Sequence, residues 1–595
     1  MESSWPLCER VCKADRLNEG SALRDWTSYN RLTGIFLLRL ILSHFFASTC
    51  AGAVYQSDGS ASSVQNLHRR ASNGDTIALP AGTFTWSTPV TISKAIKLQG
   101  AGSGRIIGNT KSSVSIGTGT KSFETTRVIP GITAGQILRI AKMPNMPRTT
   151  HAARENYMEG AVTSYSGTTL VMNIASTGGS GSWHFWWIAT KPTTTIVNNY
   201  ENGSRGNNSA PPMLQIQQSL AGSAEVTGFQ FTSSPTSVSS LIGIRTANYI
   251  TPKALIHGCW FQTGNGGKGA AIFSASNQVV IWNCSFDDTY ELSHSEAFQI
   301  KAGHGIMDAS WSTNSTMGMD DVDGAANFYI EDCDFHAHNQ VCDADDNARV
   351  VIRHCIWDNS QFANHGADTS AIGVRHIELY DNELIFDVFP GDCATEIPLQ
   401  HAVWLRGGTA VITDNVFPRI TSGCAKTKAN IMFSVLNTRR KSGPYCCWTT
   451  YPAPHQVGQG YGPGAVFHAF TGCGSYRKAD YYIYSEPAYI WNNTGSGGNL
   501  VSLNGDPDAC GNNQQVADYI QEGRDYKLEP KPGYVKYTYP HPLRSSPSRS
   551  QLKSSAAPTS SHHFHLRKER KTKKVKTGWG KAKKNPANDT AAPGQ

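Results

Sequence analysis

The sequence predicts an all-β protein whose main body is a parallel β-helix, a solenoid of stacked coils. Between residues 224 and 417 one short phrase recurs: a β-rich run, a turn pair, a small or polar residue, one more residue and usually a bulky apolar one. A repeat of this length is too short to bury a core of its own, so its units are expected to stack on one another. The small-or-polar positions are separated by 30, 25, 26, 23, 22, 27 and 33 residues; they are Phe229, Cys259, Cys284, Ser310, Cys333, Cys355, Asn382 and Asn415.

Two further observations favour strands over helices. Apolar residues alternate within each phrase, and residues two apart face the same side of a strand. No run with helical period lasts ten residues between the phrases, which disfavours a helical or leucine-rich solenoid. The 56 glycines and the low charged fraction of 16% also suit a turn-rich β protein. A β-sandwich with accidental periodicity is the alternative.

The formal charge of +8 is concentrated at the C-terminal end. Residues 544–595 hold 13 Lys and Arg against 2 Asp and Glu, whereas residues 54–543 carry a net charge of −4. The segment 544–595 is therefore predicted to be a disordered basic tail, whose only expected contact with nucleic acid or another polyanion is non-specific.

Residues 1–53 are predicted to be a leader and a secretory signal peptide. A basic residue, Arg31, precedes the apolar run GIFLLRLILSHFFA (34–47), and small residues follow up to Ala53. A buried helix and a membrane anchor are the alternatives, and lipid modification of Cys50 is a further one. Export to the extracellular space or cell surface would make the loop cysteines candidates for disulfides; these are Cys393, Cys424, Cys446, Cys447, Cys473 and Cys510.

Residues 54–109 are expected to open the solenoid. A short amphipathic helix, SSVQNLHRRAS (62–72), precedes two strand-rich runs, GDTIALPAGTFTW (74–86) and VTISKAIKLQGAG (90–102). This arrangement resembles the entrance segment of the pectate-lyase-like superfamily, whose members are right-handed parallel β-helices with a short helix over the open first coil. The resemblance implies a right-handed solenoid with an N-terminal capping helix.

Residues 110–189 interrupt the pattern with short strands and Gly/Ser turns, and are predicted to be an inserted β module. The segment resembles a module of phage tail and virion-surface proteins. Its aromatic cluster, Trp183, Phe185, Trp186 and Trp187, is expected either to form the core of the module or to stack on sugar rings. The main β-helix is predicted over 190–543. It is expected to continue past 417 through 431–437, 465–470 and 488–493, and 518–543 is expected to close it.

Counting forward from the repeat positions predicts an acidic face. Ten residues past successive positions lie His294, Asp320, Asp343, His365 and Asp392, and thirteen residues past three of them lie Asp323, Asp346 and Asp368. Like positions on stacked coils are about 4.8 Å apart, so Asp343 is expected beside His365 and Asp346 beside Asp368. Carboxylates at that spacing repel one another, which favours a bound Ca²⁺. The alternative is that these residues lie on exposed turns without a function.

Basic residues are available in the same region. They occur in CDADDNARVVIRH (342–354), VRHIELY (374–380) and WLRGGTAVITDN (404–415), which with HGADTS (365–370) resemble a branch of bacterial β-helix proteins. Similarity to pectate-lyase-like enzymes implies Ca²⁺ on Asp343, Asp345, Asp346 and Asp368, and Arg349 or Arg375 as the base that removes a proton from a uronate.

Two other functions are open. A polygalacturonase-like hydrolase would use Asp345 and Asp346 with His365, although GHG (303–305) precedes this pair and no RIK follows it, as the family pattern would require. A glycan-binding adhesin or tail-spike-like protein would need no catalysis. The sequence favours a polysaccharide lyase acting on an acidic extracellular polysaccharide. Its remaining candidate substrate-binding residues are Arg353, Arg406, His294 and Asp320.

Overall fold

The computed structural model describes the chain from residue 52 to residue 544 with gaps. The residues that it describes are 52–142, 156–184, 186–200, 212–217, 222–234, 239–244, 253–263, 270–275, 279–288, 296–301, 327–336, 338, 340–345, 348–358, 360–365, 374–385, 401–417, 430–435, 451–453, 456–461, 483–495, 497–503 and 515–544.

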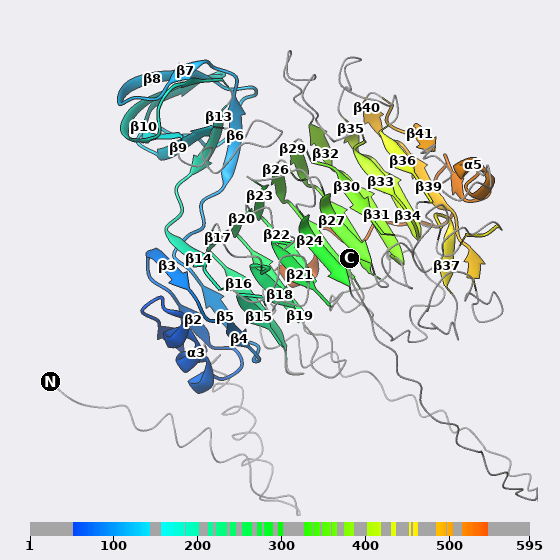
Figure 1. Ribbon diagram of the computed structural model, residues 1–595, viewed down its shortest axis with the longest axis horizontal. Coiled ribbons are helices and arrows are strands. Elements are labelled where there is room, and N and C mark those ends of the chain that lie inside the picture. The colour runs from blue at the N-terminus through cyan, green and yellow to red at the C-terminus, as the bar shows by residue number, and fades with distance from the viewer. Residues whose placement is uncertain are drawn as a thin grey trace, which may run out of the picture. The chain divides into compact units, whose positions relative to one another are not determined.

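Three long parallel sheets form a right-handed β-helix, which confirms the predicted fold (Figure 1). Along a complete coil, the first strand belongs to sheet A, the second to sheet B and the third to sheet C. Sheet A comprises β1 (Val54–Gln56), β2 (Thr76–Ala78), β5 (Lys97–Gln99), β16 (Ser223–Thr227), β19 (Lys253–His257), β22 (Val279–Trp282), β25 (Phe328–Glu331), β28 (Arg349–Arg353), β31 (His376–Tyr380), β34 (Thr409–Thr413), β39 (Ala488–Trp491) and β42 (Tyr526–Lys527).

Sheets B and C follow the same order along the chain. Sheet B comprises β3 (Gly82–Trp86), β14 (Thr194–Asn198), β17 (Gln230–Ser233), β20 (Trp260–Thr263), β23 (Ser285–Asp288), β26 (Asp334–His336), β29 (Ile356–Asp358), β32 (Glu383–Ile385), β35 (Val416–Phe417) and β40 (Thr494–Gly495). Sheet C comprises β4 (Val90–Ile92), β15 (Leu214–Ile216), β18 (Ile242–Ile244), β21 (Ile272–Ser274), β24 (Glu296–Lys301), β27 (Gln340–Asp345), β30 (Phe362–Asn364), β33 (Val403–Leu405), β36 (Ile431–Phe433) and β41 (Val501–Leu503).

The repeat position marks the corner between sheets A and B. Its cysteines and asparagines point into the coils and are buried, as the sequence predicts. The residue before each has a positive φ, which turns the chain; the non-glycine examples are Asn283, Asp332, His354, Asp381, Asp414 and Asn492. Cys259, Cys284, Cys333 and Cys355 carry free thiols, and burial raises the pKa of the Cys284 and Cys355 thiols. All four side chains are buried in the solenoid core, where they pack as small apolar groups.

Aromatic rings stack beside this column. Phe231, Phe261, Phe286 and Phe335 occupy the inward position of four successive sheet B strands, with ring centroids 5.3, 4.8 and 5.2 Å apart. Trp357 follows on β29, with its ring edge-on to Phe335 at 6.3 Å. Such contacts add roughly 0.5–1.5 kcal/mol each beyond area burial, so the stack helps to hold neighbouring coils in register.

The copy assigned to Ser310 is wrong. Strand β22 pairs directly with β25, and β23 pairs directly with β26, so Cys284 and Cys333 belong to adjacent coils. No further coil fits between them, and offsets counted from Ser310, including the one that selected Asp320, lose their basis. The solenoid does continue into the segment 431–437, where Ile431–Phe433 forms a strand of sheet C; this strand is not a copy of the sheet A phrase. Segment 488–493 is a true repeat, whose β39 pairs with β34.

The N-terminal capping helix is α3 (Ala61–Arg70). Ser60 caps it by accepting a hydrogen bond from the Ser63 amide at 3.1 Å. Its apolar side, with Ala61 and Val64 buried, joins the core of the first coils. The helix thus covers the coil end, as the sequence predicts.

The inserted module runs from β6 to β13, between β5 of sheet A and β14 of sheet B. Its strands are β6 (Ile106–Thr110), β7 (Val114–Ser115), β8 (Gly119–Glu124), β9 (Ile137–Lys142), β10 (Tyr157–Ser166), β11 (Thr169–Gly178), β12 (Ser182–Trp183) and β13 (Trp186–Thr190). They pair antiparallel in two sheets. Trp186 lies in the module core and Trp183 packs against it, which confirms the core interpretation for these two; Phe185 lies outside the described residues.

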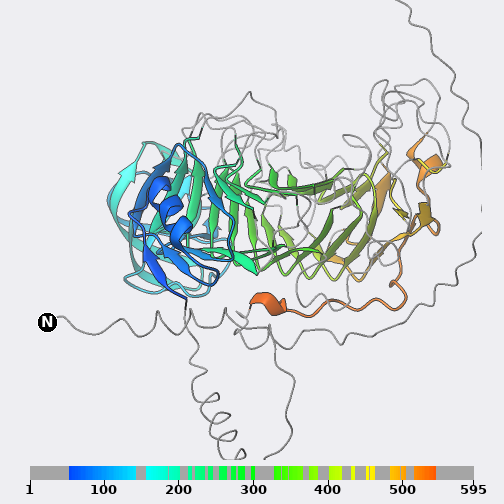
Figure 2. The ribbon, with the colours of Figure 1, turned by 90° about the horizontal axis from the view of Figure 1, so that it is seen from below.

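The C-terminal part both closes the solenoid and runs back along it. Val516 and Tyr519 of α5 (Val516–Tyr519) and Tyr526 of β42 join the core at the last coil. From there residues 528–544, which we call the strap, cross the outer side of sheet A and end in η6 (Pro542–Arg544) beside β22 (Figure 2). A short antiparallel pair, β37 (Gln459–Tyr461) and β38 (Ile483–Ser485), completes the described elements.

Candidate functional site

The outward side of sheet C carries a cluster of polar side chains. In β27, Cys342 and Ala344 belong to the solenoid core, so Asp343 and Asp345 take the alternate, outward positions. Neighbouring strands are in register, with Gln299 of β24 opposite Asp343 and Ala363 of β30 on its other side.

Asp343 and His365 lie together, as the sequence predicts. His365 directly follows β30, and its Nε2 is 2.8 Å from Oδ1 of Asp343. The ladder partner of Asp343 is Ala363, so the imidazole reaches the carboxylate from two positions further along the chain. The side chain of His365 is 13% exposed and that of Asp343 is 5% exposed, so the imidazole is the more accessible member of the pair.

The surroundings keep Asp343 ionised. Burial raises the pKa of this carboxyl, but His365, the charge of Arg406 and a hydrogen bond from Gln299 Nε2 at 3.3 Å together hold it below its usual range. An ionised carboxylate directed at Nε2 favours the tautomer in which Nε2 carries the proton and Nδ1 the lone pair. The arrangement resembles that of a carboxylate orienting a catalytic histidine.

Arg406 is fixed by Asn364, the last residue of β30. Its amide donates to Asn364 Oδ1 at 2.8 Å, its Nε donates to the Asn364 carbonyl oxygen, and Asn364 Nδ2 donates to the Gly407 carbonyl at 3.2 Å. Gly408 completes the turn at φ 74°, where an added Cβ would lie 2.5 Å from the Val374 carbonyl oxygen. The RGG segment therefore holds the Arg406 side chain in a fixed position, and its second glycine, Gly408, is sterically required.

An aromatic ring lies next to this arginine. Trp404 of β33 is half-buried on the outward side of sheet C, in register with Ala363, and the Arg406 guanidinium lies 4.9 Å from its ring centroid. Its Nε1 donates to Ser434 Oγ at 2.9 Å, which fixes the indole.

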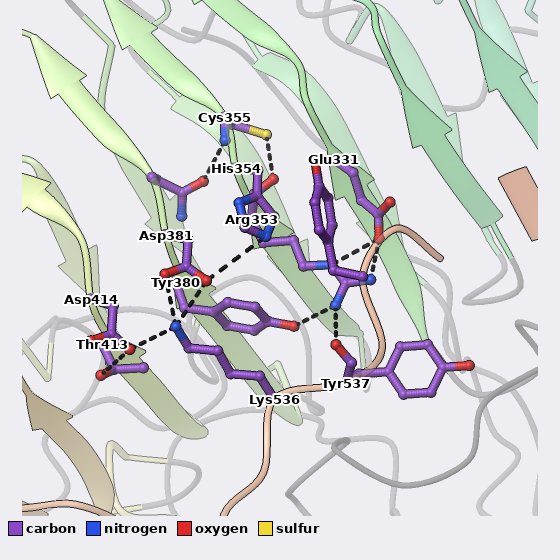
Figure 3. A network of polar contacts seen from close by, with 12 residues as sticks. Glu331, Arg353, His354, Cys355, Tyr380, Asp381, Thr413, Asp414, Lys536 and Tyr537 are labelled. Atoms are coloured by element: carbon purple, nitrogen blue, oxygen red, sulfur yellow. Dashed lines mark hydrogen bonds and ion pairs between the residues drawn. The ribbon is translucent and has the colours of Figure 1, made fainter. Parts of the chain in front are cut away.

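Arg353 and Arg375 do not join the cluster, because Arg353 lies on β28 of sheet A and Arg375 directly precedes β31 of the same sheet. Arg353 is fully buried against Glu331 and the strap, with Nη1 donating to the Tyr537 carbonyl at 2.6 Å (Figure 3). Arg375 is 1% exposed and its Nη1 contacts Glu486 Oε2 at 2.9 Å. Arg349 is the first residue of β28, next to His376 in the sheet A ladder, and is also buried. Arg353 cannot meet a substrate while enclosed, and the ion pair of Arg375 opposes its use as a base.

The described residues do not form the predicted calcium site. Asp343 has one oxygen on His365 and the other on Gln299, and Asp345 is fully buried. Across the described ranges, no group of three or more His, Cys, Asp and Glu could hold a metal ion. The other two predicted ligands, Asp346 and Asp368, lie outside those ranges, as do His294, Asp320 and the loop cysteines proposed for disulfides. Asp343 therefore fits a histidine partner better than a calcium ion.

Sequence reasoning missed Gln299, Asn364 and Trp404. Each sits on a sheet C strand, whose distance from the repeat position varies between coils. The signal for Trp404 and Asn364 was present, since Trp404 is the first residue of the motif WLRGGT and Asn364 directly precedes HGADTS. Gln299 carried no such signal.

The fold thus defines a right-handed parallel β-helix protein. The chain matches no protein-family model and none of the curated proteins. Among solved structures it is similar to the tailspike protein gp49 from Pseudomonas phage LKA1, at 12% identity over 64% of this chain and 69% of that chain, with a TM-score of 0.16. The Pseudomonas phage phi297 tailspike gp61 shows 11% identity over 62% and 70% of the chains, with a TM-score of 0.15.

A third similar structure is the gp54 tailspike of Acinetobacter baumannii bacteriophage AP22, which was solved in complex with A. baumannii capsular saccharide. It shows 9% identity over 70% of this chain and 78% of that chain, with a TM-score of 0.14. Scores this low carry no argument about function, and the fold rests on the strand pairing itself. The part of the chain that the structure describes contains no helix long and apolar enough to cross a membrane.

Proposed function

We propose that the protein is a secreted carbohydrate-active β-helix protein that binds an acidic polysaccharide on the outward side of sheet C and cleaves it by β-elimination. The observation that carries the proposal is the contact between Asp343 and His365, with Arg406 beside them. The same sheet side offers Trp404 for an apolar sugar face.

Each side chain has a distinct role. Arg406 binds the carboxylate of a uronate, because a guanidinium matches a carboxylate in charge and geometry. His365, oriented by Asp343, takes the proton from C5 of that sugar. The C5–H and C4–O bonds break, a C4–C5 double bond forms, and the departing glycosidic oxygen receives a proton. This assigns the base to His365 instead of Arg349 or Arg375.

Binding without catalysis is the second candidate. The indole of Trp404 is held in place by Ser434 and Arg406, which suits a glycan-binding surface whether or not a bond is cleaved. Secretion and a calcium requirement are proposed from the sequence alone, since both oxygens of Asp343 are engaged by His365 and Gln299 and the described residues form no metal site. Cleavage assays after chelation and re-addition of Ca²⁺ test the second, and N-terminal sequencing of exported protein tests the first.

The experiment follows unsaturated uronate release from pectate, alginate and hyaluronan. The wild type should form product from at least one of them. His365→Gln should lower kcat roughly 10²–10⁴-fold, and Asp343→Asn should lower it less, because the imidazole survives. His257→Gln is the matched control, since His257 contacts Glu225 at 2.9 Å on sheet A, away from the site. The lyase proposal falls if the wild type forms no product, or if His365→Gln is as active as the control.

A further inference from the structure

The inserted module covers part of the outward side of sheet B. Trp260 of β20 belongs to one buried apolar cluster with Ile106, Trp187 and Ala189 of the module. The core of the module, which contains Trp186, is a different cluster. The module therefore has one set of side chains that holds it together and another that docks it on the solenoid.

A histidine lies among carboxylates on the same side of sheet B. The inward positions of β23, β26 and β29 are filled by the aromatic stack, so the residues that follow them, Asp287, His336 and Asp358, point outward on three successive coils. All three are buried. The Nδ1 of His336 is 3.7 Å from Oδ2 of Asp358, and neither ring nitrogen has a hydrogen-bond partner among the residues that the structure describes.

The module contributes two groups to this cluster. The ring of Trp187 on β13 lies 5.9 Å from that of His336, centroid to centroid, and Asn109 of β6 donates to Asp358 Oδ2 at 3.2 Å. A cation within about 6 Å of an indole centroid is attracted by the ring. The imidazole thus lies between carboxylates of the solenoid and an indole of the module, and both attract it more strongly as a cation.

The charges around His336 favour its protonated form. Burial lowers the pKa of this imidazole, but Asp334 on the same strand and the two in-register carboxylates outweigh burial and raise the pKa above its ordinary value. Burial also raises the pKa of Asp334, against the opposing charges of His336, Arg105 and Arg127, of which Arg105 directly precedes β6 and Arg127 belongs to the module. Both shifts make the docked state bind protons more tightly.

We propose that a proton on His336 latches the inserted module to sheet B, and that loss of this proton loosens the module as the pH rises. Histidine is the side chain that ordinarily changes charge between about pH 5 and 8. Because the docked ring has the higher pKa, its contribution to docking is fully present below about pH 6.5, the ordinary value, and is lost as the pH rises through the docked pKa. A neutral imidazole no longer offsets the mutual repulsion of the carboxylates on either side of it.

Hydroxyl-radical footprinting of the full chain, read residue by residue by mass spectrometry, tests the latch. Oxidation of Trp187 and Trp260 reports docking, whereas oxidation of Trp186 reports whether the module stays folded. In the wild type, oxidation of Trp187 and Trp260 should rise about threefold or more between about pH 5.5 and about pH 8.5, because the linkage weakens docking over this window. Oxidation of Trp186 should stay constant.

Three variants separate the latch from a general effect of pH. His336→Gln removes the titrating ring and keeps a polar side chain, so Trp187 should be oxidised at both pH values as much as in the wild type at the higher one. Asp358→Asn keeps a hydrogen-bond acceptor and removes one charge, so the midpoint of the rise should move to lower pH. His257→Gln is the matched control, because His257 contacts Glu225 at 2.9 Å on sheet A, and its curve should coincide with that of the wild type.

Four results would overturn the latch. They are equal oxidation of wild-type Trp187 at the two pH values, a rise that survives in His336→Gln, low oxidation of Trp187 at both pH values in that variant, and a parallel rise in Trp186, which would mean that the module unfolds. If His336→Gln does not fold, Asp358→Asn decides: a midpoint at lower pH supports the latch, and an unchanged midpoint overturns it. The latch uses none of the sheet C residues assigned to the proposed reaction, so neither result bears on the cleavage assay.

Discussion

Arg353 and Glu331 occupy the same outward position on adjacent sheet A strands and form a fully buried ion pair, with Arg353 Nε 2.8 Å from Glu331 Oε1. The strap closes over this pair (Figure 3). Arg353 donates to the carbonyl oxygens of residues 537 and 538 and to Tyr380 Oη, and Glu331 accepts from the His541 amide and from Arg544. The pair thus joins two coils to the C-terminal strap.

Replacement of Arg353 by methionine should destabilise the protein strongly. It leaves the Glu331 carboxylate buried with Arg544 as its remaining cationic partner, and removal of one member of a buried pair costs roughly 3–5 kcal/mol. Urea unfolding should show this loss, and limited proteolysis should cut the strap sooner. Arg127→Ala, which removes an exposed pair with Glu383 at 3.9 Å, should cost at most about 1 kcal/mol. Equal losses in the two variants would contradict the strap's dependence on Arg353.

The residues at the corner between sheets A and B have a positive φ, so the stability of the protein should depend on which residue type occupies such a position. Asn283 is exposed and has φ 50°, so its side chain contributes little packing. Asn283→Gly should change the free energy of unfolding by less than about 0.5 kcal/mol, whereas Asn283→Val should cost roughly 1–2 kcal/mol, because a β-branched residue is strained at positive φ. Thermal unfolding of both variants checks this. Equal stability of the two would mean that the backbone at the corner shifts to accommodate valine without strain.

Sequence periodicity predicted the coils because the residue at the repeat position must point into the core in every coil. Cys259 to Asn415 all turn inward directly after the corner residue, so their spacing reports the coil length. Ser310 was misassigned because its phrase imitates the repeat within a long connection between β24 and β25. Periodicity cannot distinguish such an imitation, since only strand pairing shows that β22 adjoins β25.

The candidate site was predicted only in part, because counting from the repeat position does not fix the register of sheet C. Asp343 lies ten residues past Cys333, yet its ladder partner Ala363 lies eight residues past Cys355, so equal counting does not fix register on sheet C. The long His365 side chain bridges the difference, and the predicted contact forms. Arg353 was assigned to substrate because the strap has no repeat to reveal its course. The phrases IEDC and IRHC do place Glu331 and Arg353 at equivalent positions, a signal of an ion pair that counting alone did not use.

Because of His376, the free energy of unfolding should fall as the pH becomes mildly acidic. Burial lowers its pKa to about 4, outweighing Glu378, whose Oε1 lies 3.2 Å from Nε2; Lys531 also lowers it and Glu486 raises it. An unfolded histidine has a pKa of about 6.5. The folded value is the lower one, so the unfolded chain binds more protons between these values. Stability from the neutral ring is fully present above about pH 6.5 and is lost as pH falls towards 4.

His376→Gln should therefore flatten the pH dependence of stability in that window. The shift corresponds to roughly 3 kcal/mol at most, the remaining acid sensitivity coming from carboxylates such as Asp343 at lower pH. Melting temperatures of wild type and variant from pH 4 to 8 measure the difference. Parallel curves would show that His376 stays in the same protonation state upon unfolding.

The asparagine ladder inside the last coils should be the most sensitive part of the repeat column. Asn415 Oδ1 accepts from the amide and the side chain of Asn382 at 3.1 and 3.0 Å, and Asn415 Nδ2 donates to the Leu379 carbonyl and to Asn493 Oδ1, each at 2.9 Å. These groups are buried, so water cannot replace the lost partner. Asn415→Ala should cost roughly 2–4 kcal/mol by leaving donors and acceptors of both neighbouring coils unsatisfied.

Asn415→Cys should recover part of that loss. A cysteine at Cys355 already fills the same column, where its Sγ contacts the carbonyl of Ile330 on the preceding coil at 3.7 Å, in the place that Leu379 has for Asn415. A thiol can therefore serve this carbonyl but cannot accept both bonds from Asn382. Asn199→Ala, which removes an exposed hydrogen bond to Ser87 at 3.3 Å, should change stability by less than about 0.5 kcal/mol. Urea midpoints should therefore rank Asn199→Ala highest, Asn415→Cys next and Asn415→Ala lowest. A cysteine variant no better than alanine would mean that geometry, and not hydrogen-bond capacity, limits this column.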